Sequence, residues 1–140
     1  MVYYSIEGNV SNQLETFIVE CLNDLVPVHP EHSVDILIRM RKKIEKSWLG
    51  TCSGDTEQIT VHVATRYKGK KLGPGQIAST LAHELTHAKQ FMLGEINMVD
   101  YTWRQGSEEI DCESLSYALV PWEVQANSEE ERLVKTYWRY

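Results

Sequence analysis

The feature that most constrains this chain is a pair of histidines one helical turn apart, in the run His83-Glu84-Leu85-Thr86-His87. Residues four positions apart lie on the same face of an α-helix, so both imidazoles can reach one metal ion at about 2.0–2.1 Å. A glutamate directly after the first histidine points toward the open position of such an ion and can take a proton from water there. The run therefore predicts a metal-binding helix with Glu84 as a general base.

The residues around this run predict a helix from Pro74 to about Leu93, because proline suits the first helical position and Gly94 suits a C-terminal stop. One stripe of this helix is apolar and is expected to be buried: Ile77, Leu81, Leu85, Ala88 and Met92. A second stripe is polar and carries both histidines: Thr80, His83, His87 and Gln90. The histidines are therefore expected on the face that points away from the main apolar stripe.

A tetrahedral ion that is held by two histidines and a water needs one more protein ligand. No histidine follows His87, which excludes a scheme with three histidines. The remaining candidates are Glu108, Glu109, Asp111, Cys112, Glu113 and Glu123. We choose Glu123, because it falls in the rigid first turn of a helix expected from Pro121 to about Trp138. Asn127 lies one turn further on and can hydrogen-bond a ligating histidine. The acidic run 108–113 remains the alternative.

The rest of the chain predicts an α+β fold in one domain over residues 1–140. Ser11 is a plausible N-cap for an amphipathic helix over 11–26. Strands are predicted from alternating apolar residues, with the last of the three weaker than the others: 33–40, 58–65 and 47–53. Between the two later helices, residues 95–119 fit short loops or a hairpin better than a helix.

The composition bears on nucleic-acid binding, membrane insertion and the cellular compartment. The net charge of -6 argues against a protein that mainly coats phosphate backbones, although the loops 39–46 and 66–71 are basic. No apolar stretch approaches the length of a membrane span, and the N-terminus lacks a targeting pattern. The three cysteines form no CxxC pair, which favours reduced thiols and a cytoplasmic protein.

The His83–His87 run, followed by Glu123-Val124-Gln125-Ala126-Asn127, resembles the gluzincin pattern of zinc metallopeptidases. The sequences around both motifs also resemble small prokaryotic and phage-encoded peptidases, among them minigluzincins and ImmA/IrrE-like domains. This resemblance implies Zn²⁺ and a small zincin-like domain with an N-terminal helix and a short mixed sheet of three to four strands. The HExxH helix and a C-terminal helix with the third ligand complete it. Two positions depart from the pattern, since Gln125 replaces a frequent acid and Asn127 replaces an aspartate.

The resemblance also implies where a substrate would lie. The strand before the catalytic helix, here 58–65, would form the upper rim of a cleft, and a peptide would add antiparallel to its edge. A residue that stabilises an oxyanion is usual in such sites, and the candidates are Tyr117, Tyr101 and His62.

The resulting hypothesis is a zinc-dependent endopeptidase that hydrolyses peptide bonds with Glu84 as general base. The alternative is a non-catalytic metal-binding regulatory or interaction domain of the same fold. A DNA-associated protease of the SprT-like kind fits less well, because the chain is acidic and lacks both a third histidine after His87 and a basic zinc ribbon.

Overall fold

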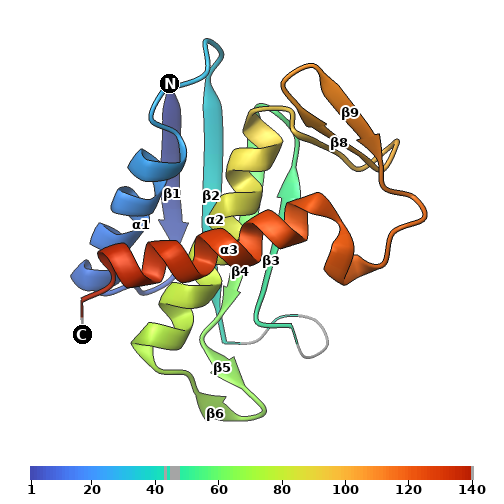
Figure 1. Ribbon diagram of the computed structural model, residues 1–140. Coiled ribbons are helices and arrows are strands. Elements are labelled where there is room, and N and C mark those ends of the chain that lie inside the picture. The colour runs from blue at the N-terminus through green and yellow to red at the C-terminus, as the bar shows by residue number, and fades with distance from the viewer. Residues whose placement is uncertain (43, 45–47, 140) are drawn as a thin grey trace.

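The computed structural model describes residues 1–42, 44 and 48–139, and the core of this part is a sheet with helices on one face (Figure 1). The main sheet is mixed and has four strands, here in spatial order: β1 (Val2–Glu7), β2 (Val34–Arg41), β4 (Gln58–Ala64) and β3 (Gly50–Gly54). Strands β1, β2 and β4 are parallel to one another. Strand β3 runs antiparallel to β4 and ends the sheet.

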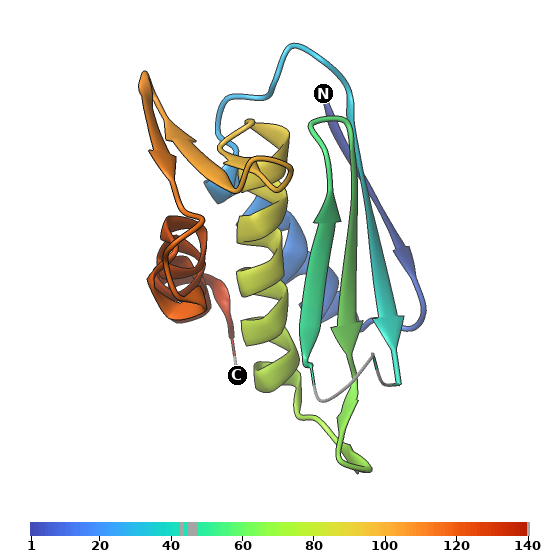
Figure 2. The same cartoon turned by 90° about the vertical axis from the view of Figure 1, so that its right-hand side faces the viewer.

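Three α-helices occur in the described part of the chain: α1 (Asn12–Leu25), α2 (Pro74–Met92) and α3 (Pro121–Tyr137). Helices α1 and α2 cover the same face of the sheet, and α3 packs on α2 from the side away from the sheet (Figure 2). Helix α2 is therefore the middle layer, with the sheet on one flank and α3 on the other. This is the mixed α+β architecture that the sequence predicts.

The alternation of side chains explains how the sheet buries one face. In β2 the apolar Val34, Ile36 and Ile38 are buried while Asp35 is exposed, as expected for a half-buried strand. The same pattern in β4 buries Ile59, Val61 and Val63. These side chains pack against the apolar stripe of α2, whose members are all buried: Ile77, Leu81, Leu85, Ala88 and Met92. Because the core buries this stripe, the histidines lie on the other, polar stripe of α2.

The helix ends are set by the residues that the sequence indicates. The Ser11 hydroxyl accepts a hydrogen bond from the Leu14 amide at 3.2 Å and caps α1. Helix α2 begins at Pro74, and just beyond its end Gly94 takes a φ of +69° that favours glycine. Pro121 likewise begins α3. The predicted boundaries of all three helices are confirmed to within a residue or two.

The smaller elements differ more from expectation. Strand β1 was not predicted, and the basic segment after β4 forms a short hairpin, β5 (Arg66–Tyr67) with β6 (Lys70–Lys71). The segment between α2 and α3 holds a three-stranded antiparallel sheet and the 3-10 helix η1, with these bounds: β7 (Ile96–Asn97), β8 (Thr102–Gln105), β9 (Glu108–Asp111) and η1 (Tyr117–Leu119). This agrees with the interpretation that short loops or a hairpin fit residues 95–119 better than a long helix.

One prediction about the sheet needs correction. The strand expected to form a free rim, 58–65, is β4, and both of its edges are paired, with β2 on one side and β3 on the other. The free edge next to α2 belongs to β3, which overlaps the weaker strand candidate 47–53. Ser47 of that candidate, and Lys43 and Lys46 of the basic stretch 39–46, lie outside the described residues.

Among the described residues, no helix combines the length and the apolar character that crossing a membrane requires. The three cysteines are free thiols, as the sequence predicts, and Cys21 and Cys112 are buried.

Candidate metal centre

Two histidines of α2 and one glutamate of α3 meet between these helices. The Nε2 atom of His83 lies 3.1 Å from Oε1 of Glu123, and Nε2 of His87 lies 3.1 Å from Oε2 of the same carboxylate. One potential ligand atom from each residue falls within 4.8 Å of the other two. Among the described residues this is the one group of three or more His, Cys, Asp or Glu side chains with such spacing. The structure therefore brings together the three ligands that the sequence predicts.

The first turn of α3 explains why Glu123 is held rigidly. The Val120 carbonyl accepts hydrogen bonds from the amides of Glu123 and Val124, both at 3.1 Å, which closes the turn that Pro121 begins. Buried Trp122 and Ala126 anchor this turn against the rest of the molecule. The Glu123 side chain is left 7% exposed and points at α2.

Charge at the cluster follows from this close approach. Burial alone would raise the pKa of Glu123, but the hydrogen bonds from His83 and His87 outweigh burial and lower that pKa to about 2. Burial likewise would lower the pKa of His83, whereas hydrogen bonds to Glu123 and Glu130 raise it to about 10. The site therefore stabilises negative charge on Glu123 and attracts positive charge beside it.

The orientation of His83 tests whether a cation fits. Its Nδ1 atom lies 3.0 Å from Oε1 of Glu130, and a carboxylate can only accept, so Nδ1 carries the proton of the neutral ring. The lone pair of Nε2 then faces the Glu123 carboxylate, which also only accepts. Only a positive charge, a proton or a metal ion, reconciles two such acceptors. Ligands about 2.0–2.1 Å from a tetrahedral ion are about 3.3 Å apart, close to the 3.1 Å observed.

The predicted general base lies beside this cluster. Glu84 is 7% exposed and packs against the start of β3, where a methyl group added to Gly50 would lie 2.9 Å from its Cγ. Burial raises the pKa of the Glu84 carboxyl to about 7, although the neighbouring His87 and His83 act in the opposite direction. A carboxyl group with a pKa near neutrality can both accept and return a proton, which is the property a general base needs.

The three candidates for oxyanion stabilisation have different positions. Tyr117 of η1 is near the cluster: most of its side chain is exposed, but partial desolvation and the charge of the nearby Glu123 raise its pKa to about 12. Tyr101 packs its ring edge-on against Trp122, with centroids 5.1 Å apart, so it supports the first turn of α3. His62 of β4 alternates with the buried valines, so it points to the sheet face opposite α2 and is not part of the cluster.

The alternative acidic ligands and Asn127, which the sequence also suggests for the site, are not part of the cluster. The alternative acidic ligands lie on β9, whose residues are all exposed, or directly after it, and Glu109 pairs with Arg104 at 3.0 Å. Asn127 is exposed, and the side chain that holds Nδ1 of His83 is Glu130. Glu130 follows Glu123 by seven residues, which places both on the same face of α3. That spacing is the signal in the sequence from which the role of Glu130 could have been inferred.

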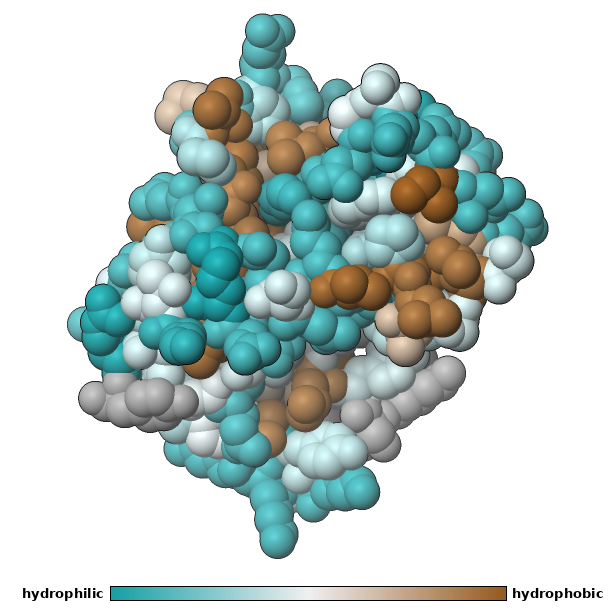
Figure 3. Space-filling model, in the orientation of Figure 1, coloured by the Kyte–Doolittle hydropathy of each residue, from teal (hydrophilic) through white to brown (hydrophobic). Residues whose placement is uncertain are grey.

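The surface next to the cluster is apolar. Figure 3 shows hydrophobic side chains gathered over the start of α3 and the segment before it, and the exposed apolar residues there are Leu115, Leu119 and Val124. Together with the exposed Tyr117 they form an apolar surface on residues 115–124, the segment that also carries Glu123. Comparisons of the chain with protein-family models, with curated proteins and with solved structures find no match.

Proposed function

We propose that this chain is a zinc-dependent endopeptidase of the gluzincin type. The observation that carries the proposal is the cluster of His83, His87 and Glu123 with the carboxyl of Glu84 beside it. Two imidazoles and one carboxylate form a donor set that catalytic zinc prefers, and it leaves a fourth position for water or substrate. The order of the motifs along the chain and the resemblance to small gluzincins support the same assignment.

Each side chain has a role that follows from its position. Bound Zn²⁺ would supply a Lewis acid that makes water more acidic and polarises the carbonyl of the bond to be cleaved. Glu84 accepts the proton of the attacking water and passes it to the leaving nitrogen, so the carboxylate is regenerated when the peptide bond has broken. The Tyr117 hydroxyl, beside Glu123, donates a hydrogen bond to the carbonyl oxygen as that oxygen gains negative charge.

The substrate is expected to bind as an added strand on β3, in place of the strand 58–65 that the resemblance to gluzincins implies. Within the described part of the chain, strand β3 pairs with β4 on one side only, so its other edge can bond to an extended peptide. Gly50 brings this strand into close contact with Glu84, so the added peptide would pass next to the general base. The exposed apolar side chains of Leu115, Leu119 and Val124 would contact apolar side chains of that peptide.

The deciding experiment combines metal analysis with a peptide-library digestion. Protein purified without chelators should hold one zinc per chain and should cleave peptides until EDTA is added. Glu84→Gln should retain the zinc and lose turnover by about 10²- to 10⁴-fold, because only proton transfer is removed. Glu131→Gln, an exposed change on α3, is the matched control and should cleave normally.

Three outcomes would refute the proposal in different ways. A chain that binds no zinc would contradict the metal site itself. A Glu84→Gln variant with wild-type turnover would contradict the role of Glu84. Zinc binding without any cleavage would favour the non-catalytic metal-binding domain instead.

A further inference from the structure

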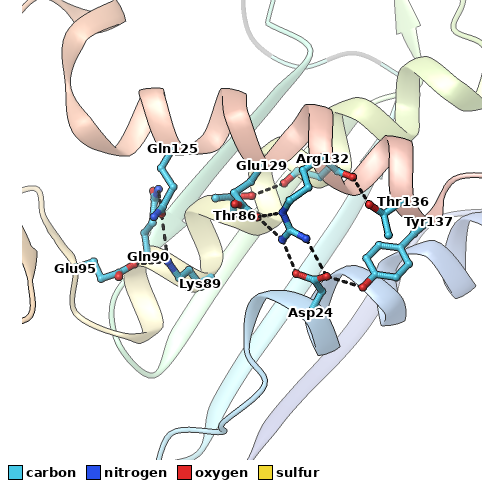
Figure 4. Close-up of polar contacts among 11 residues, drawn as sticks. Asp24, Thr86, Lys89, Gln90, Glu95, Gln125, Glu129, Arg132, Thr136 and Tyr137 are labelled. Atoms are coloured by element: carbon cyan, nitrogen blue, oxygen red, sulfur yellow. Dashed lines mark hydrogen bonds and ion pairs between the residues drawn. The ribbon is translucent and has the colours of Figure 1, made fainter.

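Gln90 is a buried amide that joins the two metal-bearing helices. It lies on α2 three residues after His87, and its side chain is fully buried. Its Oε1 lies 2.8 Å from Nδ1 of His87, and its Nε2 donates to the Trp122 carbonyl at 3.0 Å. Figure 4 shows Gln90 between the two helices, next to Gln125 of α3 and Lys89 of α2.

Neighbouring groups fix which end of the Gln90 amide is the donor. Lys89 can only donate, and its Nζ contacts Oε1 of Gln125 at 3.2 Å. The Gln125 atom at this point must therefore be its oxygen. Since the same oxygen lies 2.9 Å from the Gln90 amide, the Gln90 atom that faces it must be nitrogen.

The backbone of α3 leads to the same orientation independently. The Trp122 carbonyl is an acceptor and cannot donate, so the Gln90 atom beside it must also be the nitrogen. With its nitrogen facing α3, Gln90 presents its oxygen to His87. That oxygen only accepts, so Nδ1 of His87 must carry a proton. In the neutral ring, Nε2 then has a free lone pair and faces Glu123.

We propose that Gln90 is a positioning residue that selects the metal-binding tautomer of His87 and fixes the distance between His87 and Glu123. The proposal rests on the zinc site proposed above and concerns how that site is assembled. The oxygen of the Gln90 amide accepts a hydrogen bond from the His87 ring of α2, and its nitrogen donates one to the Trp122 carbonyl, directly before Glu123 on α3. A shift of α3 along α2 would therefore break a bond inside the apolar interior, where an unpaired amide is costly.

The roles of Gln90 and Glu130 differ. Glu130 holds His83 from a partly exposed position with a charge, whereas Gln90 holds His87 from full burial without one. The neutral amide of Gln90 orients the His87 ring without adding a negative charge. The cluster already contains the carboxyl groups of Glu84, Glu123 and Glu130. Loss of Gln90 should therefore affect geometry more than charge.

The test compares Gln90→Met with Gln76→Met in zinc affinity, measured by competition with a chelator. Methionine keeps the length and volume of the side chain but offers no amide. Gln76 hydrogen-bonds the Gly73 amide at the start of the same helix, so its replacement removes a bonded amide far from the cluster. Gln90→Met should bind zinc about 10- to 100-fold more weakly, and Gln76→Met should match the wild type.

A second measurement needs no variant and decides the tautomer if Gln90→Met fails to fold. In ¹H–¹⁵N spectra of the zinc-loaded wild type, His87 should show a slowly exchanging proton on Nδ1. A proton on Nε2 would overturn the inference. Equal zinc affinity of Gln90→Met and wild type would also overturn it while leaving the zinc site intact. A wild type that binds no zinc would refute both proposals.

Discussion

Nε2 of His87 and Oε2 of Glu123 lie 3.1 Å apart although the entire β7–β9 segment separates them in the chain. The contact requires α3 to cross α2 at one position, and several bonds hold it there. Gln90 ties the first turn of α3 to α2, and Arg132 near its other end binds Asp24 of α1 (Figure 4). The candidate metal centre thus depends on helix packing, and the sheet contributes none of its three potential ligands.

Glu123→Gln should remove most of the affinity for zinc, because an amide oxygen lacks the negative charge of the carboxylate. The loss of zinc affinity should exceed the roughly 10- to 100-fold loss that follows removal of a side chain that hydrogen-bonds a metal ligand. Competition with a chelator measures it, and Glu131→Gln on the same helix is the control. Unchanged zinc binding by Glu123→Gln would mean that another side chain completes the site.

Zinc should stabilise the folded chain, since its ligands come together only when α2 and α3 are packed. At a free concentration about 100 times its dissociation constant, a ligand that binds only the native state adds about 2.7 kcal/mol to the free energy of unfolding. Thermal unfolding with and without zinc measures this shift. Glu84→Gln should keep the shift and Glu123→Gln should lose it. An equal shift in both variants would place the ion elsewhere.

Gly50→Ala should destabilise the protein by about 1–3 kcal/mol and reduce peptide cleavage, because an added methyl group overpacks the contact between β3 and α2. The new Cβ would lie 2.6 Å from Cγ2 of Thr80 and 2.9 Å from Cγ of Glu84. Gly73→Ala is the matched control, since its Cβ would make only an ordinary contact at 3.6 Å with Gln76. Urea unfolding and cleavage rates provide the two readouts. Equal effects of the two changes would contradict the tight packing at Gly50.

Stability should fall in acid partly through Asp24. The hydrogen bonds from Arg132 and Tyr137 lower the pKa of this carboxyl below its ordinary value of 3.8, so the unfolded chain takes up its proton first. The resulting stability is present above the unfolded pKa and is lost as the pH falls through the folded one. Because the pair is partly exposed, Asp24→Asn should cost about 1 kcal/mol at pH 7.

The same comparison at low pH provides the check. Urea unfolding of wild type and Asp24→Asn should give free energies that converge as the pH falls below 3.8 and through the lower pKa of the folded state, where the native carboxyl also loses its charge. A difference that stays constant from neutral pH to this range would show that the lost contact is not electrostatic.

Much of the fold could be predicted because its signals are local. The spacing of apolar residues and the residues at the helix ends, such as Ser11, Pro74 and Pro121, identify all three helices. The histidines of the site follow from the same spacing. Glu123 required more, since its choice depended on the rigidity of a helix start and on Asn127 one turn further on, and the resemblance to gluzincins agreed with that choice.

The parts that could not be predicted depend on pairing between distant segments. Strand β1 has only Val2 and Ile6 partly buried, and it is held by parallel pairing with β2, which leaves no mark in its own sequence. The spatial order of the strands also differs from their order along the chain, so the sequence does not show that β3 lies at the edge of the sheet. For the same reason Gln90 became visible as the partner of His87 only once α2 and α3 were placed together.

Strand β3 has five residues and glycine at both ends, and at Gly54 any side chain would collide with the Gln58 carbonyl. At about 3.4 Å per residue, such an edge offers only about 17 Å of backbone for docking. If substrates bind there, recognition covers a handful of consecutive positions, all of which must be unpaired in the target. Intact globular proteins rarely expose such stretches, so the proposed peptidase would be expected to act on linkers, frayed ends and misfolded chains.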